Sequence, residues 1–396
     1  MLEEGLKAAV AKVGAHLDAL EGAFVSRRAL LELVMLGLLT REHVLLIGPP
    51  GTGKSAAVQA LARALDASTF DYLIGRFTEP GELFGALDLD ALRDGQIRPV
   101  TKGMLPEAEV AFLDEIFLGS TAILNSLLKI LNERTYRRGQ FGMSVPLISC
   151  IAASNELPQD TALAAFADRF LLTMFVDPVG DEALGALIQA GWDDMRGAHA
   201  PVPPLEHGVL ATLQAAVLEV DLAPIHDDYA HIARKIRLLG LSLSDRKLVK
   251  GLKLIAASAL LRGSLVAGKE DLWPVTYLVQ SRQHQSELRQ LLHAELQHSR
   301  NPVLTGSVAQ ATHDLTAHAA QLGERATHLL QARPQDGGGE QIEHWLVRLE
   351  TMLTRIDAAF APDAMPPHLA ALHKEIETAL AKGADTLVAK DAVSGD

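Results

Sequence analysis

Residues 48–55 read Gly-Pro-Pro-Gly-Thr-Gly-Lys-Ser, and the segments on either side make this stretch decisive for the fold. The apolar run 43–47 precedes it, and the helix-like segment AAVQALARAL follows it. A Gly-x-x-x-x-Gly-Lys-Ser sequence between a strand and a helix is typical of a phosphate-binding loop. Its glycines leave backbone N–H groups open to phosphate oxygens, and the helix turns its positive N-terminal end toward the same anion. The sequence therefore predicts a nucleoside triphosphate site.

Two residues of this loop have specific expected tasks. Lys54 is expected to contact the β- and γ-phosphates, and Ser55 to ligate Mg²⁺. An Asn-Lys-x-Asp segment that would read guanine does not occur in the sequence, which favours ATP as the nucleotide. The residues expected to bind it are Gly48, Pro49, Pro50, Gly51, Thr52, Gly53, Lys54 and Ser55.

Two acids follow the apolar run Val110 to Leu113. A buried strand that ends in two carboxylates delivers both to the sheet edge where ligands bind. There Asp114 is expected to reach the Mg²⁺ through water, and Glu115 to orient and polarise the attacking water. A base beside the γ-phosphate favours hydrolysis over phosphoryl transfer to a second substrate. Beside a phosphate loop, this interpretation is preferred to that of a strand ending in solvated acids.

Three further polar residues stand at the ends of predicted elements. Asn155 follows the apolar run 147–153 and can hydrogen-bond the same water or the γ-phosphate. Arg169 precedes the last apolar run, where an ion pair with Asp168 is the simplest interpretation. Arg246 lies in the first turn of a predicted helix with Ser244 or Asp245 as its N-cap. A basic residue there opposes the helix dipole unless an anion lies opposite.

The pattern of apolar runs predicts the fold class. Two helices are expected between residues 5 and 40, followed by five strand-like runs that alternate with helices. This order predicts an α/β P-loop NTPase core, in which helices cover both faces of a five-stranded parallel sheet. The expected strands are 43–47, 70–74, 110–113, 147–153 and 171–176.

Three domains are expected. The αβα core takes residues 1–180, an all-α lid 181–280, and a C-terminal helical bundle or stalk 281–396. The bundle is expected to contain helices within 306–332, 340–360 and 366–389, with a flexible turn at Gly337 to Gly339.

Composition excludes several classes of protein. The 396 residues are 48% hydrophobic and 21% charged, as in ordinary globular proteins. A net charge of −13 argues against a surface that binds nucleic acid throughout. Cys150, the single cysteine, lies in an apolar run, so a buried structural role is expected. Because no signal-like segment begins the chain and no long apolar stretch occurs, we expect a cytoplasmic protein without a membrane span.

The ordered set GPPGTGKS, VAFLDE, ASNE, ADRF and SDRK resembles the AAA+ ATPases, and within them the MoxR group. The segments YLIGRFTEPGELFGALDLDAL, GMLPEAEVAFLDEI, ILNSLLKILNER and AASNELP look most like the RavA branch. The resemblance is dense over 20–180, thinner to about 280, and only helical in character beyond. The order of five motifs makes it specific, although each motif alone is ambiguous.

The resemblance implies a role for each matching residue. Lys54 and Ser55 match the first Walker motif, Asp114 and Glu115 the second, and Asn155 the sensor 1 residue. It further implies that Arg169 is an arginine finger inserted into the neighbouring subunit's site. Arg246 matches sensor 2, which implies that it reaches from the lid to the γ-phosphate of its own subunit. The arginines at 134, 137 and 138 can assist in trans or simply be solvated.

The resemblance also implies partners. Such proteins assemble as hexameric rings with nucleotide between subunits, and they usually act with a protein bearing a von Willebrand A domain as chaperones of enzyme complexes. The segment 78–105 falls where this group carries an inserted helix and hairpin facing the pore. RavA proteins carry a small β-rich module in their C-terminal region, whereas this sequence has only the glycine turn at that place. The partner contact that the module provides elsewhere is therefore in doubt.

Two alternatives stay open at this stage. A nucleic-acid motor or initiator of the same superfamily should carry a basic helix-turn-helix or arm, and the last 100 residues show few basic clusters. A nucleotide-switched scaffold with little turnover fits every motif except Glu115 and Arg169. The preferred hypothesis is a ring ATPase that remodels a protein client.

Overall fold

The computed structural model describes residues 3–197, 202, 204–241, 243–312, 323, 325–334, 339–359, 365 and 368–380. The chain forms two compact units, Met1–Thr312 and His313–Asp396, and each is described by itself. The predicted domain boundaries at 180 and 280 stay predictions, whereas the boundary between these units follows residue 312.

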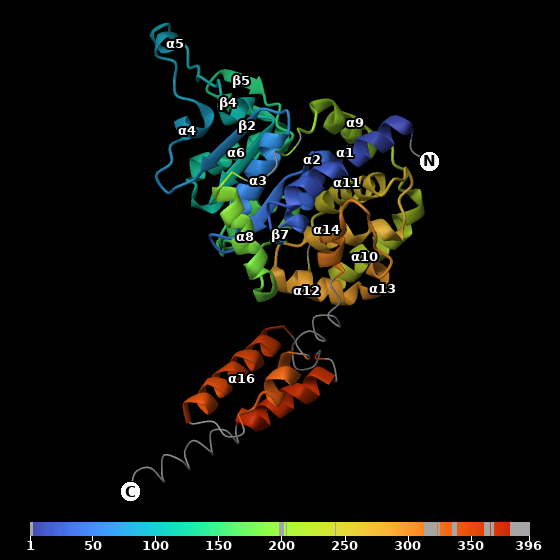
Figure 1. Cartoon of the computed structure of the whole chain (residues 1–396). Coiled ribbons are helices and arrows are strands. Elements are labelled where there is room, and N and C mark those ends of the chain that lie inside the picture. Colours follow the sequence, from blue (N-terminus) through green and yellow to red (C-terminus); the bar gives the residue numbers. More distant parts are fainter. Residues whose placement is uncertain are drawn as a thin grey trace. The chain divides into compact units, whose positions relative to one another are not determined.

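A five-stranded sheet forms the centre of the nucleotide-binding part of the first unit (Figure 1). Its order is β2-β3-β6-β1-β7, and every neighbouring pair is parallel, as the sequence predicted. Because Ile47 at the end of β1 is level with Ser154 and Phe175, the carboxyl ends of three strands share one edge. The strands are β1 Val44–Ile47, β2 Thr69–Leu73, β3 Val110–Asp114, β6 Ser149–Ser154 and β7 Leu172–Phe175.

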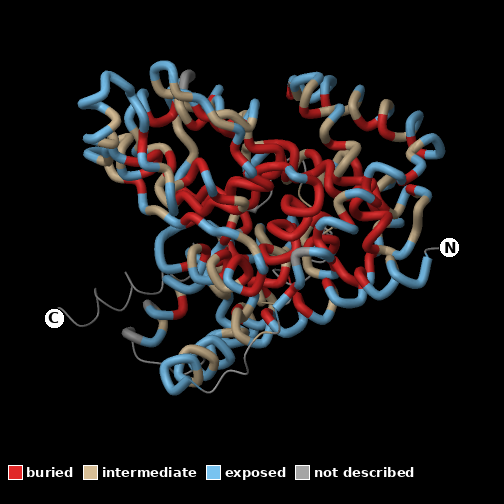
Figure 2. Tube along the Cα trace, turned by 90° about the horizontal axis from the view of Figure 1, so that it is seen from above, coloured by how far each residue is buried: buried red, intermediate tan, exposed pale blue. Residues whose placement is uncertain are grey.

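Alternate residues of each strand serve two apolar cores, as the pleat requires. Val44 and Leu46 point to the side covered by α2 (Arg28–Thr40) and α3 (Lys54–Ala64). Leu45 and Ile47 belong to the opposite core, which includes residues of α6 (Thr121–Glu133) and α7 (Thr161–Ala167). The sheet is thus covered on both faces, and the buried chain runs through the middle of this unit (Figure 2).

Helix α2 connects the sheet to the helical part of the first unit. Every residue of α2 except Ala29 is buried, and the helix packs against α1 (Glu4–Glu21), α9 (His207–Val217) and α11 (Asp245–Leu261) as well as the sheet. A helix that is hydrophobic on all sides needs partners on all sides, which explains this central position. The remaining helices of this part are α8 Leu184–Met195, α10 His226–Leu238, α12 Arg282–Leu291, α13 His293–Leu296 and α14 Thr305–Ala311.

A buried ion cluster ties the segment after residue 280 to the first unit. Arg28 Nε donates to Glu32 Oε1 at 2.5 Å, and Glu32 Oε2 accepts the N–H of Ser307 at 2.6 Å. Gly306 allows this approach because a Cβ there would lie 2.8 Å from Arg28 Cγ. Removing one partner of such a buried pair leaves an uncompensated charge, so these contacts hold α14 firmly on α2.

The insertion between β2 and β3 contains two short helices, α4 (Pro80–Phe84) and α5 (Leu89–Arg93). Backbone bonds from Asp88 N to Arg98 O and from Val100 N to Ala86 O pair the two arms beside α5. A separate antiparallel hairpin that the sequence analysis missed follows α6 and consists of β4 (Thr135–Arg138) and β5 (Phe141–Ser144). Figure 1 shows α5 and this hairpin projecting on the same side of the first unit.

In the second unit, three helical segments share one apolar core in its described part. The longest is α16 (Gly339–Ala359), and its Trp345 Nε1 donates to Leu329 O at 2.7 Å. Ile356, Leu369 and Ile376 are buried in the same core. Gly337 and Gly338 of the predicted glycine turn lie outside the described residues, as do 313–322 and 324 of the segment 306–332, whereas Gly339 begins α16. No helix within the described ranges combines the length and hydropathy of a membrane span.

Candidate nucleotide-binding site

The phosphate loop lies between β1 and α3, as predicted. Its glycines are required for two reasons: left-handed backbone conformation and close packing. Gly51 (φ 77°) and Gly53 (φ 75°) occupy left-handed backbone conformations, which side chains disfavour. Gly48 is needed for close packing, because a Cβ there would lie 2.1 Å from Val176 O. The loop therefore depends on the strand beside it as well as on its own turns.

Lys54 folds back over this loop. Its ammonium donates to the carbonyl oxygens of Gly48 (2.7 Å) and Pro49 (2.9 Å), and the residue is only 6% exposed. Burial lowers the pKa of Lys54, while the carboxylates of Asp114 and Glu115 act in the opposite direction. A desolvated ammonium held at the loop can exchange carbonyl partners for phosphate oxygens with little further loss of hydration.

Ser55 and Asp114 face each other across the site. Ser55 Oγ donates to Asp114 Oδ2 at 2.8 Å, although the two residues belong to α3 and β3. A hydroxyl and a carboxylate supply the hard oxygen ligands that Mg²⁺ prefers, and Mg²⁺ in such sites takes its other ligands from phosphates and water. The donor set therefore fits the predicted metal.

Glu115 and Asn155 form the second pair. Asn155 Nδ2 donates to Glu115 Oε1 at 2.5 Å, from the ends of neighbouring strands. Glu115 has φ 52° and ψ 43°, a left-handed conformation that is costly for a residue with a side chain. Such strain persists only where the surroundings enforce it, and here it turns the carboxylate toward Asn155.

Arg27 was not found by sequence reasoning. Its guanidinium donates to Thr52 O in the loop (2.7 Å) and to Asp177 O beyond β7 (3.0 Å), and the residue is 8% exposed. Arg27 thus braces the loop against the strand that follows. A lone arginine before a predicted helix carries no sequence signal for this contact, because both acceptors are backbone oxygens.

The structure does not place Arg169 or Arg246 at this loop. Leu171, two residues after Arg169, donates to His43 O at the start of β1, whereas the loop follows the end of that strand. A four-residue strand spans about 13 Å. Arg246 lies near Arg169, because its guanidinium donates to Asp168 O (3.3 Å). Helix α11 packs at the opposite sheet edge, where Lys250 donates to Glu42 just before β1. Arg246 therefore lies away from the loop of its own chain in this arrangement, and its role at the γ-phosphate of its own subunit stays a prediction.

The guanidinium of Arg169 contains a buried donor without a hydrogen-bond partner in the described part of the chain. Arg169 Nε is buried and has no hydrogen-bond partner among the described residues. An unpaired buried donor costs free energy unless a ligand or another chain satisfies it.

The predicted N-cap of α11 at Ser244 is confirmed, because its Oγ accepts the N–H of Lys247 at 3.3 Å.

The three arginines after α6 have separate roles. Arg134 donates to the carbonyls of Leu131, Arg41 and Ile148, which fixes it as a brace under the sheet. Arg138 donates to Gly85 O in the insertion, while Arg137 is exposed. A role of Arg134 in a neighbouring site is thereby disfavoured.

Cys150 is buried, and burial raises its pKa to about 12, so its thiol is inert as predicted. The Cys150 N–H donates to His43 Nδ1 at 2.9 Å, and the Arg134 guanidinium lies 2.8 Å from Nε2. Burial, followed by the charge of Arg134, lowers the pKa of His43 to about 3.

This histidine gives a pH prediction. Below about pH 6.5 the unfolded chain protonates His43, whereas the folded chain does so only below about pH 3. The unfolded state therefore binds more protons between these limits, and stability falls as the pH falls. We expect this group to cost about 1.4 kcal/mol of unfolding free energy per pH unit between pH 6 and 4. Denaturant unfolding at several pH values should show that the unfolding free energy of His43→Asn depends less on pH than that of the wild type. His298→Asn, at an exposed position, is the control and should keep the wild-type dependence. The same pH dependence in the wild type and both variants would contradict the lowered pKa of His43.

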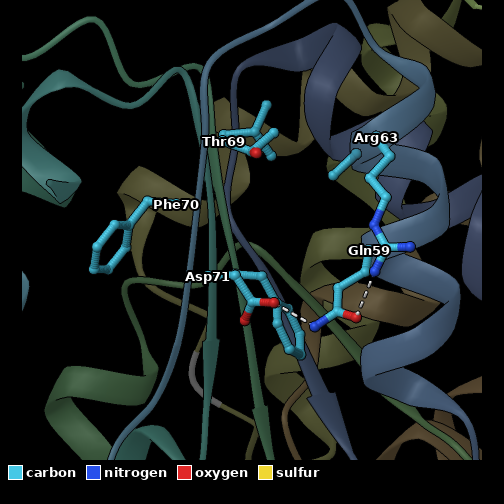
Figure 3. Close-up of a pocket in the computed structure, with 8 residues that line it drawn as sticks. Gln59, Arg63, Thr69, Phe70 and Asp71 are labelled. Carbon is cyan, nitrogen blue, oxygen red and sulfur yellow. Dashed lines mark hydrogen bonds between the residues drawn. The ribbon is translucent and has the colours of Figure 1, made fainter. Parts of the chain in front are cut away.

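A cavity of about 160 Å³ lies beside the edge strand β2 and does not include the loop. Its rim carries a hydrogen-bonded chain in which Arg63 donates to Gln59, and Gln59 donates to Asp71 (Figure 3). The Gln59–Asp71 bond joins α3 to β2, so these polar groups satisfy one another. The cavity therefore gives no separate indication of a ligand.

The fold and the juxtaposed loop, carboxylates and asparagine define a P-loop nucleotide-binding protein. Residues 11–215 match the family described as the MoxR domain in the MoxR-vWA-beta-propeller ternary systems. The chain therefore belongs to the MoxR group of AAA+ ATPases.

Curated relatives agree with this membership. An uncharacterized protein of Methanocaldococcus jannaschii is 38% identical over 258 residues, which cover 64% of this chain and 68% of the relative. Protein MoxR of Paracoccus denitrificans is 29% identical over 40% of this chain and 48% of its own. Chaperone MoxR1 of Mycobacterium tuberculosis is 29% identical over 44% of this chain and 46% of its own. The chain thus spans about half the length of the two MoxR proteins.

A solved structure supports the fold alone. The crystal structure of a candidate ATPase from Cytophaga hutchinsonii superimposes with a TM-score of 0.60. The match covers 76% of this chain and 97% of the other, at 16% identity.

Proposed function

We propose that this protein hydrolyses ATP and uses the energy to remodel or activate a protein complex. One observation carries the proposal: the fold brings Lys54, Ser55, Asp114, Glu115 and Asn155 to one sheet edge from three strands and the loop. A binding loop alone would serve a kinase or a switch equally well. The carboxylate of Glu115 and the amide of Asn155 that orients it favour water as the acceptor of the γ-phosphoryl group.

Each residue has a separate task in this mechanism. Loop N–H groups and Lys54 bind the phosphates, and Ser55 with Asp114 would hold Mg²⁺. When bound, the ion neutralises phosphate charge. Glu115 accepts the proton of the attacking water, and Asn155 orients the Glu115 carboxylate through its 2.5 Å bond.

The charge that develops on the γ-phosphate needs a further cation. Arg169 and Arg246 lie at the opposite edge of their own sheet, so we propose that both serve the site of a neighbouring copy. The unpaired Nε of Arg169 supports this assignment, because a phosphate would satisfy it. A site divided between copies requires assembly, and we propose a hexameric ring.

The description of the matched family indicates the kind of partner protein. The matched family is described by its occurrence with vWA and beta-propeller proteins, and we propose that a von Willebrand A domain protein presents the client. The motif segments favour the RavA branch within the group. A gene for a von Willebrand A domain protein beside this one would support the partner, and coexpression with purification would test it.

The proposed activity predicts a loss of nucleotide binding in Lys54→Ala. The buried ammonium donates to two carbonyl oxygens of the loop, so its removal should weaken ATP binding by about tenfold or more. Titration with a fluorescent ATP analogue measures this change. Lys129→Ala on α6 serves as control. Unchanged affinity of Lys54→Ala would contradict the nucleotide site itself.

A further inference from the structure

The segment that follows β7 lies beside the phosphate loop. Phe175 at the end of β7 is level with Ile47 at the end of β1, so the chain leaves both strands at the same edge of the sheet. Gly48 packs directly on this segment, because a Cβ there would lie 2.1 Å from Val176 O. The backbone just after β7 is therefore one wall of the loop.

Arg27 forms a second link between the loop and this segment. Its guanidinium donates to Thr52 O and Asp177 O, and Nη1 also donates to Ser26 O at 2.8 Å. Burial lowers the pKa of Arg27, whereas the carboxylate of Asp177 acts in the opposite direction. A buried cation held by three carbonyl oxygens has little freedom to move. A shift of Asp177 O would therefore move the guanidinium that holds Thr52.

Helix α12 holds Asp177 from the other side. Both terminal nitrogens of Arg282 donate to the two carboxylate oxygens of Asp177, at 2.8 Å each. This bidentate geometry makes an arginine–carboxylate pair directional as well as strong. The Arg282 guanidinium also lies over the ring of Phe175, 4.9 Å from its centroid. The first residue of α12 thus contacts both the end of β7 and the segment after it.

The same helix is anchored on the sheet one turn further along. Gln285 is buried, and its amide donates to Thr173 O at 2.9 Å and to Val279 O at 2.7 Å. Ser281 caps the helix, because its Oγ accepts the N–H of His284 at 3.4 Å. Since the first turn of α12 is fixed in this way, it gives Asp177 a firm support.

We propose that Arg27 and Arg282 are positioning residues for ATP, joined through Asp177 into one series of contacts from α12 to the phosphate loop. We call these three residues the α12 relay. Arg27 holds the carbonyl of the loop, and Arg282 holds Asp177 where Arg27 needs its acceptor. A loop that is already held in one conformation loses less entropy when it binds a ligand, so the relay raises the affinity for ATP. The inference rests on the proposed function only in that the loop binds ATP.

A direct effect of charge would act in the other direction at Asp177. If only the negative charge of Asp177 mattered, its removal would strengthen the binding of an anion such as ATP. The α12 relay predicts weaker binding, because alanine keeps the backbone carbonyl but releases it from Arg282. Asp177→Ala therefore separates a positioning role from an effect of charge.

Equilibrium titration with a fluorescent ATP analogue tests the relay. Asp177→Ala and Arg282→Ala should each raise the dissociation constant by about threefold or more, as expected of residues that act through another. The unfolding free energy should stay near that of wild type, because ion pairs between exposed side chains contribute little to stability. Lys12→Ala is the matched control, since Lys12 forms an exposed ion pair with Glu206 in the same unit.

Combined substitutions test whether the two arginines act in series. Arg27→Ala should weaken ATP binding by about tenfold, the loss of a hydrogen bond from a charged group. Adding Arg282→Ala should then weaken it no further, because Arg282 acts only through Arg27. Arg27→Lys takes the place of the alanine variant if that variant does not fold, with the same expectation. In Arg282→Ala, KM for ATP should rise while kcat stays near that of wild type, since the relay acts on binding.

Several outcomes would overturn the inference. Tighter binding by Asp177→Ala would show that its charge alone matters, and additive losses in the double variant would show that the arginines act independently. Wild-type affinity in Arg282→Ala would disconnect α12 from the loop. A wild-type chain that binds no ATP would overturn the proposed function and the α12 relay together, whereas normal binding by the wild type and all the variants would remove the relay alone.

Discussion

Replacing Glu115 by glutamine is expected to reduce ATP hydrolysis by about 10²–10⁴-fold, the usual contribution of a general base. The amide keeps the size of the side chain and an oxygen that can accept from Asn155, but it cannot take a proton from water. Nucleotide affinity should therefore stay near that of wild type. Steady-state phosphate release, measured beside equilibrium binding, separates the two effects.

The control for this experiment is Glu219→Gln, an exposed carboxylate beyond α9 that should leave both quantities unchanged. Hydrolysis by Glu115→Gln within about threefold of wild type would remove Glu115 as the base. The proposal that the protein hydrolyses the ATP that it binds would then lose its main support.

Arg169→Ala is expected to lower hydrolysis by about 10³-fold or more, the usual contribution of an arginine finger. Binding of ATP to an isolated chain should not change, because Arg169 lies at the sheet edge opposite its own loop. Folding stability should not fall, since the substitution removes a buried donor that has no partner among the described residues. Phosphate release at a concentration that permits assembly measures the effect, with Arg348→Ala in the second unit as control. A loss of ATP affinity in the monomer would contradict the trans assignment.

Much of the nucleotide-binding core is readable from local sequence. All five expected strands end within one residue of those observed, because each is a short apolar run between polar turns. The loop, Asp114 and Glu115 follow such runs directly, so their placement at one edge is a consequence of parallel strand order. The β4–β5 hairpin was missed because TYRR and FGMS carry no sustained apolar alternation.

Tertiary contacts explain what the sequence could not show. The position of Arg246 depends on how α11 packs, and the capping pattern around Ser244 is the same wherever the helix lies. Glu32 and Ser307 meet across 275 residues, and no local pattern predicts that meeting. Arg27 acts through backbone oxygens, which every sequence possesses. Local patterns therefore identified the half of the site built on strands, and packing decided where the arginines lie.

The central claim is that one hydrolytic site is built from two copies of the chain, and mixing two inactive variants tests it most directly. Lys54→Ala lacks the loop half and Arg169→Ala lacks the arginine half, so each alone should hydrolyse ATP at a small fraction of the wild-type rate. In an equal mixture about a quarter of the interfaces would join an intact loop to an intact arginine, if assembly is random and head-to-tail. We predict that hydrolysis recovers to about that fraction of wild type; a mixture no more active than its components would contradict the account.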